Sequence, residues 1–408
     1  MPILDVLIVG GGASGFFCGC ELLLNNPNLN VEIWEKSAKT LGKVRISGGG
    51  RCNVTHDLRE SRILIKKYPR GGKYLRHKLN EFGVQDTINW FQNQGVELKT
   101  EDDFRMFPIT DSSETIAQCL EHTFKKWGGR IRRQTGLEKV QFQNDTWNLE
   151  STQGDISQSK YIVLAIGGLT TVKSNWLESQ FSIKTTALVP SIFTLNINDK
   201  SLHDLSGLSV ADGRIKYEGF KSDYEGPVLI THWGISGPAV LASSAWHALD
   251  LHELDYNAVV QVGWIAEKNE DTIRELLSQH LELQKLKSIR NAVAFGLPRR
   301  LWEWIIGYSG ISDDKNCVDL RKDERNRLIE SLMRTKFQVS GRTTYKEEFV
   351  TAGGVDLSEL MPDGTLKSNK NLYSVGEMLN IDGVTGGFNF QAAWSTAYVC
   401  AHSILNKC

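Results

Sequence analysis

The chain has 408 residues, which is enough for two or three domains that each bury a core. A hydrophobic content of 40% and a formal net charge of -1 are typical of an ordinary globular protein, and they give no global electrostatic case for binding nucleic acid or a membrane. No apolar run approaches the roughly 18 residues of a membrane span, and the apolar start leads directly into glycines without a cleavage site. We therefore expect a cytoplasmic protein.

The first 35 residues predict a dinucleotide-binding βαβ unit. An apolar strand leads into Gly10, Gly12 and Gly15 in Gly-x-Gly-x-x-Gly spacing, a helical pattern follows, and a second strand, "VEIWE", ends at Glu35. The first glycine permits a tight turn, the second lets the backbone approach a pyrophosphate, and the third allows close helix packing. Glu35 stands where an acid accepts hydrogen bonds from a ribose, which favours an adenosine without a 2′-phosphate.

The C-terminal stretch "NLYSVGEMLNIDGVTGGFNFQAAWS" indicates that the dinucleotide is FAD. A strand ends at Gly376 and Glu377, and the last helix opens at Gly386 and Gly387, so a carboxylate and several backbone donors would meet one ligand. Such donors suit the carbonyl edge of a flavin, which becomes more anionic on reduction. No second glycine fingerprint appears, so any NAD(P)H is expected to visit the flavin transiently.

A second glycine-rich stretch, "SGGGRCN" at 47–53, is expected to line the cofactor with its backbone, because three glycines relax the limits on φ. For each of three residues in this stretch, two roles stay open. Arg51 pairs either with the pyrophosphate or with a carboxylate on a neighbouring strand, and Asn53 holds a loop or touches the flavin. Cys52 is either a small residue packed under the flavin or a low-pKa thiol that donates a proton to a substrate.

The seven cysteines have no paired spacing, so neither disulfides nor a metal site is expected, and the thiols should be free. The strand "KYIVLAIGGLT" ends near Gly167, which is either a cofactor contact or a plain turn. Asn389 and Gln391 on the last helix bond the flavin pyrimidine, or their aromatic neighbours simply pack.

The chain resembles a bacterial family of FAD-binding flavoproteins labelled BaiN/RdsA-type or aminoacetone-oxidase-type. The resemblance spans nearly the whole chain and rests on "VGGGASGFFCG", "SGGGRCNVTH", "LAIGGLT", "LITHWGISGPAVL", "VTAGGVDLSEL" and "LYSVGEMLNIDGVTGGFNFQAAWS". It differs at His56, where asparagine is usual; at Gly42, which stands in place of arginine before Lys43; and at "TLKSNKN", which replaces "TMESK".

The resemblance implies an α/β fold: a Rossmann-like FAD-binding domain of the glutathione-reductase-like type, with an inserted β-rich domain and a small helical subdomain. Short β-like runs after residue 188 and helical apolar spacing after residue 266 support it. The expected domains are 1–187 and 349–408 for FAD, 188–265 and 333–348 for the β-rich insertion, and 266–332 for the helices.

The resemblance also implies noncovalent FAD, and it places "THWGISGP" on the substrate side of the flavin. His232 in that motif is then a substrate contact, or else a satisfied loop histidine. The catalytic candidates are Cys52 and His232. The cofactor-binding candidates are Gly10, Gly12, Ala13, Ser14, Gly15, Glu35, Lys43, Ser47, Gly48, Gly49, Gly50, Arg51, Cys52, Asn53, Gly167, Gly376, Glu377, Gly386, Gly387, Phe388 and Asn389.

The segment 59–78 is the one strongly basic stretch, with eight lysines and arginines against Glu60 and with two interleaved tyrosines. It suits contact with ribosomal RNA, although solvated basic surfaces are also common; "GLPRRLW" at 296–302 is a smaller spot of the same kind. Members of the resembled family oxidise amines, reduce steroid-like bile acids, or reduce uridine in large-subunit ribosomal RNA. Because of the basic segment, we predict an FAD-dependent oxidoreductase that uses NAD(P)H to reduce such a uridine to dihydrouridine. The alternatives are a small-molecule oxidase or reductase, and an FAD-containing RNA-binding or scaffold protein with little turnover.

Overall fold

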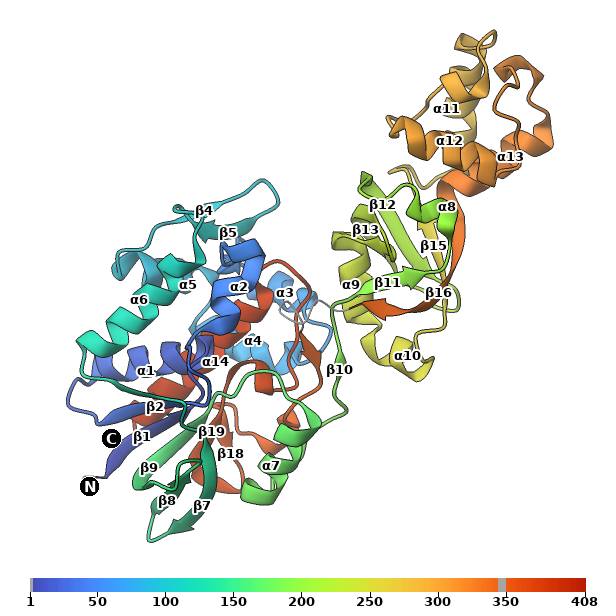
Figure 1. The fold of residues 1–408 in the computed structure, drawn as a ribbon. Helices are drawn as coiled ribbons and strands as arrows, with labels where there is room; N and C mark the ends of the chain where they lie inside the picture. The colour runs from blue at the N-terminus through green and yellow to red at the C-terminus, as the bar shows by residue number, and fades with distance from the viewer. Residues whose placement is uncertain (1–2, 344–349) are drawn as a thin grey trace. The chain divides into compact units, whose positions relative to one another are not determined.

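The computed structural model describes residues 3–343 and 350–408. By internal contacts the chain divides into two units (Figure 1). The first comprises the described residues up to Ser191 and those from 350 onward, and the second comprises those from Ile192 to 343.

A mostly parallel sheet forms the centre of the first unit, with the strand order β18-β19-β9-β1-β2-β6 (Figure 1). All neighbouring pairs are parallel except β18 with β19. The strands are β1 (Leu4–Val9), β2 (Val31–Glu35), β6 (Arg130–Arg133), β9 (Ile156–Leu164), β18 (Thr365–Leu366) and β19 (Asn369–Ser374). The central strand β1 is apolar at almost every position because both of its faces are buried, as is usual in parallel sheets.

Helix α1 (Ala13–Asn25) packs against the C-terminal helix α14 (Phe388–Leu405), so the two ends of the chain share one core. An antiparallel meander joins β7, β8 and the start of β9. The remaining elements of this unit are α2 (Gly42–Gly50), β3 (Thr55–His56), α3 (Ser61–Leu64), α4 (Gly72–Glu81), α5 (Val84–Asn93), β4 (Leu98–Thr100), β5 (Arg105–Pro108), α6 (Ser113–Lys126), β7 (Leu137–Gln143), β8 (Thr146–Ser151), α7 (Thr171–Phe181), β10 (Val189–Pro190) and β17 (Thr351–Ala352).

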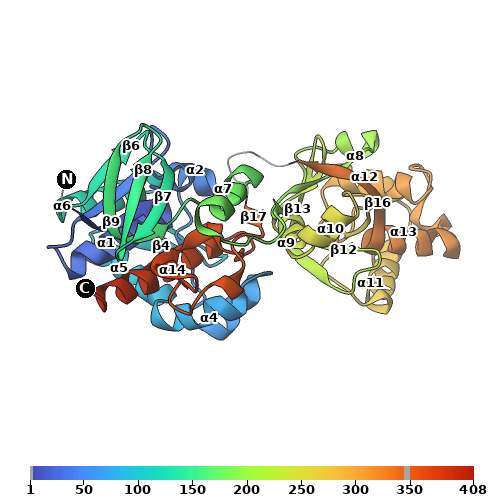
Figure 2. The ribbon, with the colours of Figure 1, turned by 90° about the horizontal axis from the view of Figure 1, so that it is seen from below.

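The second unit is a closed six-stranded barrel in the order β11-β14-β13-β12-β15-β16, with three longer helices gathered at one end (Figure 2). The strands are β11 (Thr194–Ile197), β12 (Ser209–Tyr217), β13 (Asp223–Thr231), β14 (Gly234–Ser236), β15 (Val259–Gly263) and β16 (Thr335–Thr343). The helices are α8 (Lys200–His203), α9 (Pro238–Trp246), α10 (Ala248–Glu253), α11 (Glu270–Leu283), α12 (Arg299–Tyr308) and α13 (Lys322–Arg334).

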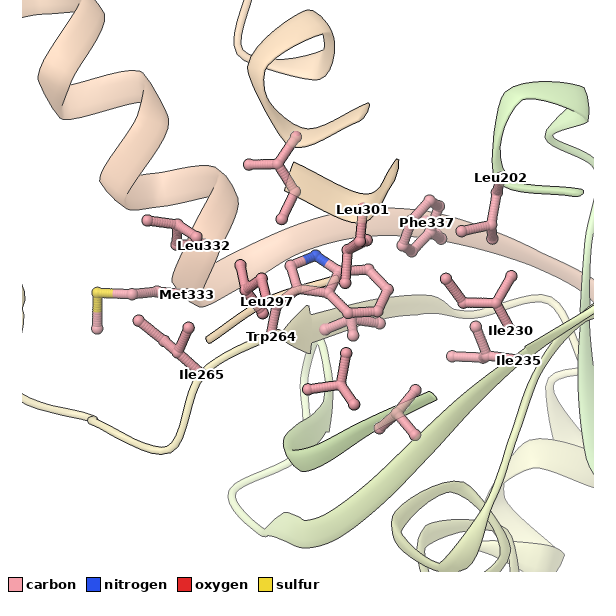
Figure 3. Close-up of a cluster of buried hydrophobic side chains, with 14 of the residues drawn as sticks. Leu202, Ile230, Ile235, Trp264, Ile265, Leu297, Leu301, Leu332, Met333 and Phe337 are labelled. Carbon is pink, nitrogen blue, oxygen red and sulfur yellow. The ribbon is translucent and has the colours of Figure 1, made fainter. Parts of the chain in front are cut away.

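One continuous hydrophobic core joins the barrel to these helices (Figure 3). Trp264 follows β15 at the junction, and its indole N–H donates to the Thr335 hydroxyl at 2.8 Å, where α13 passes into β16. Leu301 from α12 and Phe337 from β16 belong to the same cluster. The expected α/β fold with a β-rich insertion is confirmed, and the helices after the barrel pack on it in one core. Within the described ranges, no helix has the length and apolarity to span a membrane.

The junction predicts a sharp difference between two tryptophans of this unit. Trp264→Ala removes a fully buried side chain and its hydrogen bond, so we expect the free energy of unfolding to fall by about 3–5 kcal/mol. Trp233→Ala is the matched control, because Trp233 is 55% exposed, and we expect a change within about 0.5 kcal/mol. Denaturant titration followed by far-UV circular dichroism measures both, and equal losses would contradict the shared core.

Candidate cofactor site

The glycines of the first motif divide into two that close-pack and one that faces open space. Gly10 has φ +114°, and a Cβ there would lie 2.3 Å from the carbonyl oxygen of Ala165. A Cβ on Gly15 would lie 2.1 Å from the carbonyl oxygen of Gly10, whereas one on Gly12 would meet nothing within 4 Å. The first and third glycines therefore close the strand-to-helix turn, and the second leaves room beside it for a ligand.

The N-terminus of α1 has unneutralised donors at this opening. No side chain caps the helix at Gly12, and its first turn contains no acidic residue. Because the free N–H groups and the helix dipole favour an anion, this end can receive a phosphate. Ser14 in the first turn lies beside Gly376 at the end of β19, where a Cβ would come within 2.3 Å of its hydroxyl oxygen. The C-terminal motif thus reaches the first one at the carboxyl ends of the parallel strands.

Glu35 ends β2 with its carboxylate held by local donors. It accepts the N–H of Gly11 at 2.7 Å on one oxygen, and the N–H and O–H of Ser37 at 2.7 and 2.6 Å on the other. Since a carboxylate offers about four acceptor positions, these three bonds leave capacity for one more donor, such as a ribose hydroxyl.

A second carboxylate lies where three segments meet. Glu377 accepts both hydrogen bonds from the Lys43 ammonium, at 2.7 and 2.8 Å, and a Cβ on Gly168 would lie 2.9 Å from one of its oxygens. Gly167 is in the left-handed region, with φ +67°, and faces the same carboxylate. Lys173 donates to the carbonyls of Ile166 and Gly168 at 2.7 and 2.9 Å, so it fixes the turn after β9.

The stretch 47–53 adopts the backbone that its glycines permit. Gly48, Gly49 and Gly50 have φ +57°, +68° and +83°, and a Cβ on either of the last two would meet nothing within 4 Å. The stretch begins at a kink in α2 after Ser47, whose hydroxyl donates to the Val44 carbonyl at 2.9 Å. Its exposed backbone is free to line a ligand.

Asn53 joins this stretch to the glycine loop before α14. With its amide oriented to satisfy its partners, the oxygen accepts the Gly387 N–H at 3.1 Å and the nitrogen donates to the carbonyls of Thr55 and Met106 at 2.9 and 3.2 Å. Asn389 holds the other side of the loop, because its side chain donates to the Gly383 carbonyl at 3.0 Å and accepts the Gly383 N–H at 2.8 Å. Both amides therefore shape the loop.

His56, the position that differs from the resembled family, also belongs to this loop. Its Nδ1–H donates to the Gly386 carbonyl at 3.0 Å, and its ring stacks on Phe388 at a centroid distance of 4.6 Å. Burial lowers the pKa of His56, and the hydrogen bond to Gly386 only partly opposes this. A neutral imidazole can donate one N–H to this carbonyl, and an asparagine amide could donate the same hydrogen bond.

The surroundings of Cys52 favour a small packed residue, which is one of the two roles open for it. The side chain is fully buried in the apolar core, and burial raises the pKa of the Cys52 thiol to about 12. Neighbouring Arg51 does not lower it, since its guanidinium is bound to Glu101 at 2.6 Å and stacks on Phe107 at 4.0 Å. Arg51 thus pairs with a carboxylate, which is one of the two roles open for it.

The amide of Gln391 is likewise hydrogen-bonded within the protein. Its amide oxygen accepts the hydroxyls of Thr55 and Thr87 at 2.6 and 3.0 Å, and its nitrogen donates to Ser395 at 3.0 Å. The side chain is fully buried, so it supports α14 rather than reaching a flavin.

His232 is exposed at the turn between β13 and β14 in the second unit.

Two of the eight cations in segment 59–78, for which RNA contact or a solvated surface is expected, are bound inside the fold. Arg70 makes a two-pronged ion pair with Asp382, with Nε to Oδ1 at 2.5 Å, and the Asp382 side chain is fully buried. Lys78 is 1% exposed and donates to the Pro362 carbonyl at 2.8 Å, and burial lowers its pKa to about 8. The spot at 296–302 is also engaged, because Arg299 pairs with Glu303 and Arg300 donates to the Asp204 carbonyl.

Three residues that the sequence does not single out hold this region. Asp382 accepts hydrogen bonds from Arg70 and from the Ser191 hydroxyl, the latter at 2.6 Å, and Lys173 closes the turn after β9. An acid inside the glycine-rich stretch 376–389 is the only local signal for Asp382, and Ser191 carries none.

Solved structures with this fold include oxidoreductases. The chain superposes on a 3-ketosteroid delta1-dehydrogenase from Sterolibacterium denitrificans with a TM-score of 0.53, 10% identity and full coverage of both chains. It superposes on an open conformation of a flavocytochrome c3 fumarate reductase with a TM-score of 0.50 and 15% identity, covering 99% of this chain and 78% of that one. The fold is that of this class of enzyme.

Residues 4–403 match the family described as HI0933-like protein Rossmann domain, and the chain belongs to this family of FAD-dependent oxidoreductases. A ribosomal RNA dihydrouridine synthase of Haemophilus influenzae is 30% identical over 98% of both chains. A protein of the same name from Escherichia coli is 26% identical over 99% of both. A 3-dehydro-bile acid delta(4,6)-reductase of Clostridium scindens is 23% identical over 98% of both.

The residues at the sheet edge fit FAD. The open position at Gly12, the uncapped start of α1 and the remaining acceptor capacity of Glu35 suit its adenosine and pyrophosphate. The open backbone at Gly49 and Gly50 suits a flat group without requiring a side chain.

Two glycine substitutions should separate cofactor binding from folding. Gly12→Val adds a side chain into open space, so we expect the protein to fold with little change in its unfolding midpoint but to lose most of its FAD. Gly15→Ala forces a Cβ against the Gly10 carbonyl, so we expect a loss of at least about 1–3 kcal/mol of stability. Flavin absorbance and thermal unfolding measure the two effects, and a Gly12→Val protein with full FAD would refute the assignment.

The burial of Cys52 predicts selective thiol chemistry. With a pKa raised to about 12, Cys52 stays protonated at neutral pH, so iodoacetamide should leave it unmodified in the folded protein. The exposed Cys408 is the control and should be alkylated first. Peptide mass spectrometry before and after denaturation checks this. Rapid alkylation of Cys52 in the folded protein would contradict the prediction and support a reactive thiol.

Proposed function

We propose that the protein reduces a uridine of large-subunit ribosomal RNA to dihydrouridine, with FAD as the bound cofactor and NAD(P)H as the electron donor. The observation that carries the proposal is the full-length similarity, at 30% identity, to a ribosomal RNA dihydrouridine synthase. The exposed cations between residues 62 and 76 add a surface of the right charge for RNA. Such a substrate also suits the cytoplasmic location that the sequence suggests.

Each end of the cofactor has candidate residues in the first unit. Gly10, Gly12 and Gly15 would admit the pyrophosphate to the start of α1, with the N–H groups of Ala13 and Ser14 as donors, and Glu35 would accept a ribose hydroxyl. Toward the ring, the backbone of 47–53 and of Gly386 to Asn389 would form the wall, while the Lys43–Glu377 pair and Gly167 would border the middle of the cofactor.

The bound flavin supplies hydride transfer, and the protein supplies orientation and electrostatics. Reduction adds a hydride to C6 of the uracil and a proton to C5, with NAD(P)H oxidised to NAD(P)+. Because Cys52 is fully buried in the apolar core, we assign this proton to another group or to solvent. His232 is an exposed candidate for contact with the substrate.

A second candidate function is the reduction of a steroid-like small molecule. The similarity to a 3-dehydro-bile acid delta(4,6)-reductase over 98% of both chains favours it, at 23% identity. In that case the cations of 62–76 would have no role in the reaction.

One experiment distinguishes the two functions. The purified FAD-loaded protein is incubated with NADPH or NADH and with large-subunit ribosomal RNA from cells that lack the gene, and dihydrouridine is mapped by mass spectrometry. We expect one new dihydrouridine per RNA and an equal amount of NAD(P)H consumed. The same protein with a conjugated steroid enone is the parallel reaction, and reduction of the enone with unchanged RNA would replace the proposal by the second candidate.

A further inference from the structure

Five cations between residues 62 and 76 form an exposed group without carboxylate partners, which we call the cation face: Arg62, Lys66, Lys67, Lys73 and Arg76. None of them makes an ion pair with another described residue, whereas nearby Arg59 binds Asp57 and Arg70 binds Asp382. The segment therefore contains two kinds of cation: buried ones, which hold the fold, and exposed ones, which do not.

Clustered like charges repel one another and lower the stability of the compact state, so the fold itself gains nothing from the cation face. A polyanion reverses this, because each phosphate that a lysine or arginine neutralises releases condensed counterions. The chain as a whole has a formal charge of -1, so this positive field is local and directs an anion to one place.

A groove of about 690 Å³ lies beside two residues of the cation face, Lys66 and Lys73. Its walls include Lys66, Lys73, Tyr74 and Pro69 from the segment and Ser358 from the C-terminal part of the first unit. Among the described residues, the charged side chains that line it are the two lysines, and no carboxylate lines it. The volume lies within the range of small-ligand sites, so the groove can accept a nucleotide unit.

The segment that lines this groove is joined to the glycine loop before α14. The Tyr68 hydroxyl donates to the Phe388 carbonyl at 2.7 Å, and the Val384 N–H donates to the Lys67 carbonyl at 3.0 Å. A Cβ on Gly71 would come within 2.5 Å of the Ile381 side chain, so the two segments are in close contact. An RNA held in the groove would thus lie beside the loop that is assigned to the flavin wall.

We propose that the cation face and its groove bind the sugar–phosphate backbone of single-stranded RNA beside the uridine that is reduced. This inference rests on the proposed function. Single-stranded RNA fits better than a duplex, because a flavin needs access to the face of the uracil and paired bases have their faces stacked. The groove holds the neighbouring nucleotides while the uridine itself is exposed.

The test measures binding of the FAD-loaded protein to a uridine-containing single-stranded RNA oligonucleotide by fluorescence anisotropy across a salt series. Each phosphate contact to a single strand contributes a slope of about -0.7 in log K against log salt. Lys66→Gln, Lys67→Gln and Lys73→Gln combined should therefore make the slope shallower by about 2 and weaken binding at least about tenfold at low salt. The corresponding triple change to arginine should restore the wild-type slope.

The matched control removes the same charge from the second unit. Lys216→Gln, Lys287→Gln and Lys322→Gln combined change three exposed lysines that have no ion pair among the described residues, and the slope should stay at the wild-type value. Equal losses in the two triple variants, or equal binding of a duplex of the same sequence, would overturn the inference.

Turnover separates this inference from the proposed function. If the wild-type protein makes dihydrouridine but the Lys66, Lys67 and Lys73 triple variant keeps its salt slope and its KM for RNA, the surface assignment is wrong and the reaction stands. If the wild-type protein leaves RNA unreduced, the proposed reaction fails, whatever the oligonucleotide measurements give.

Discussion

The close packing of three backbone segments at the carboxyl end of β1 is the constraint on which the site depends. Gly10 lies against the Ala165 carbonyl and Gly15 against the Gly10 carbonyl, with no space for a side chain at either contact. These contacts set the angle at which α1 leaves the sheet, and hence where its uncapped N–H groups point. Because β19 lies on the other side of β9, Gly376 and Glu377 reach the same edge from the far end of the chain.

A second set of contacts ties the C-terminal glycine loop to two early segments. Asn53 binds the backbone of Gly387, and Arg70 binds Asp382 in a buried ion pair. Breaking one partner of such a pair leaves an uncompensated buried charge, so the pair fixes the loop even where its net contribution to stability is small. The loop therefore has a defined shape before any cofactor binds, which lowers the entropic cost of binding.

The order of elements and the dinucleotide fingerprint could be predicted from the sequence because their signals are local. Glycine spacing, strand hydrophobicity and an acid at the end of β2 all lie within 35 residues. The roles of Cys52, Arg51 and Gln391 could not be predicted, because each depends on partners far along the chain or on burial. Arg51 is 50 residues from Glu101, and Gln391 is more than 300 residues from Thr55. A cysteine after three glycines resembles a reactive thiol until its surroundings prove to be apolar.

For the same reason, the charge of the basic segment does not show which of its cations are buried. The sequence does not distinguish the eight lysines and arginines from one another. In the structure, however, Arg70 and Lys78 point inward and hold the segment to its neighbours. The inward cations fix the position of the outward ones relative to the glycine loop, since Arg70 lies between Lys67 and Lys73 in the chain. Relatives named as a ribosomal RNA dihydrouridine synthase and as a bile acid reductase both match nearly the whole chain, so overall similarity does not by itself select the substrate. Under the proposed function, the substrate is selected by surfaces outside the nucleotide-binding edge of the sheet. The cation face is such a surface, and a steroid-like substrate would not require it.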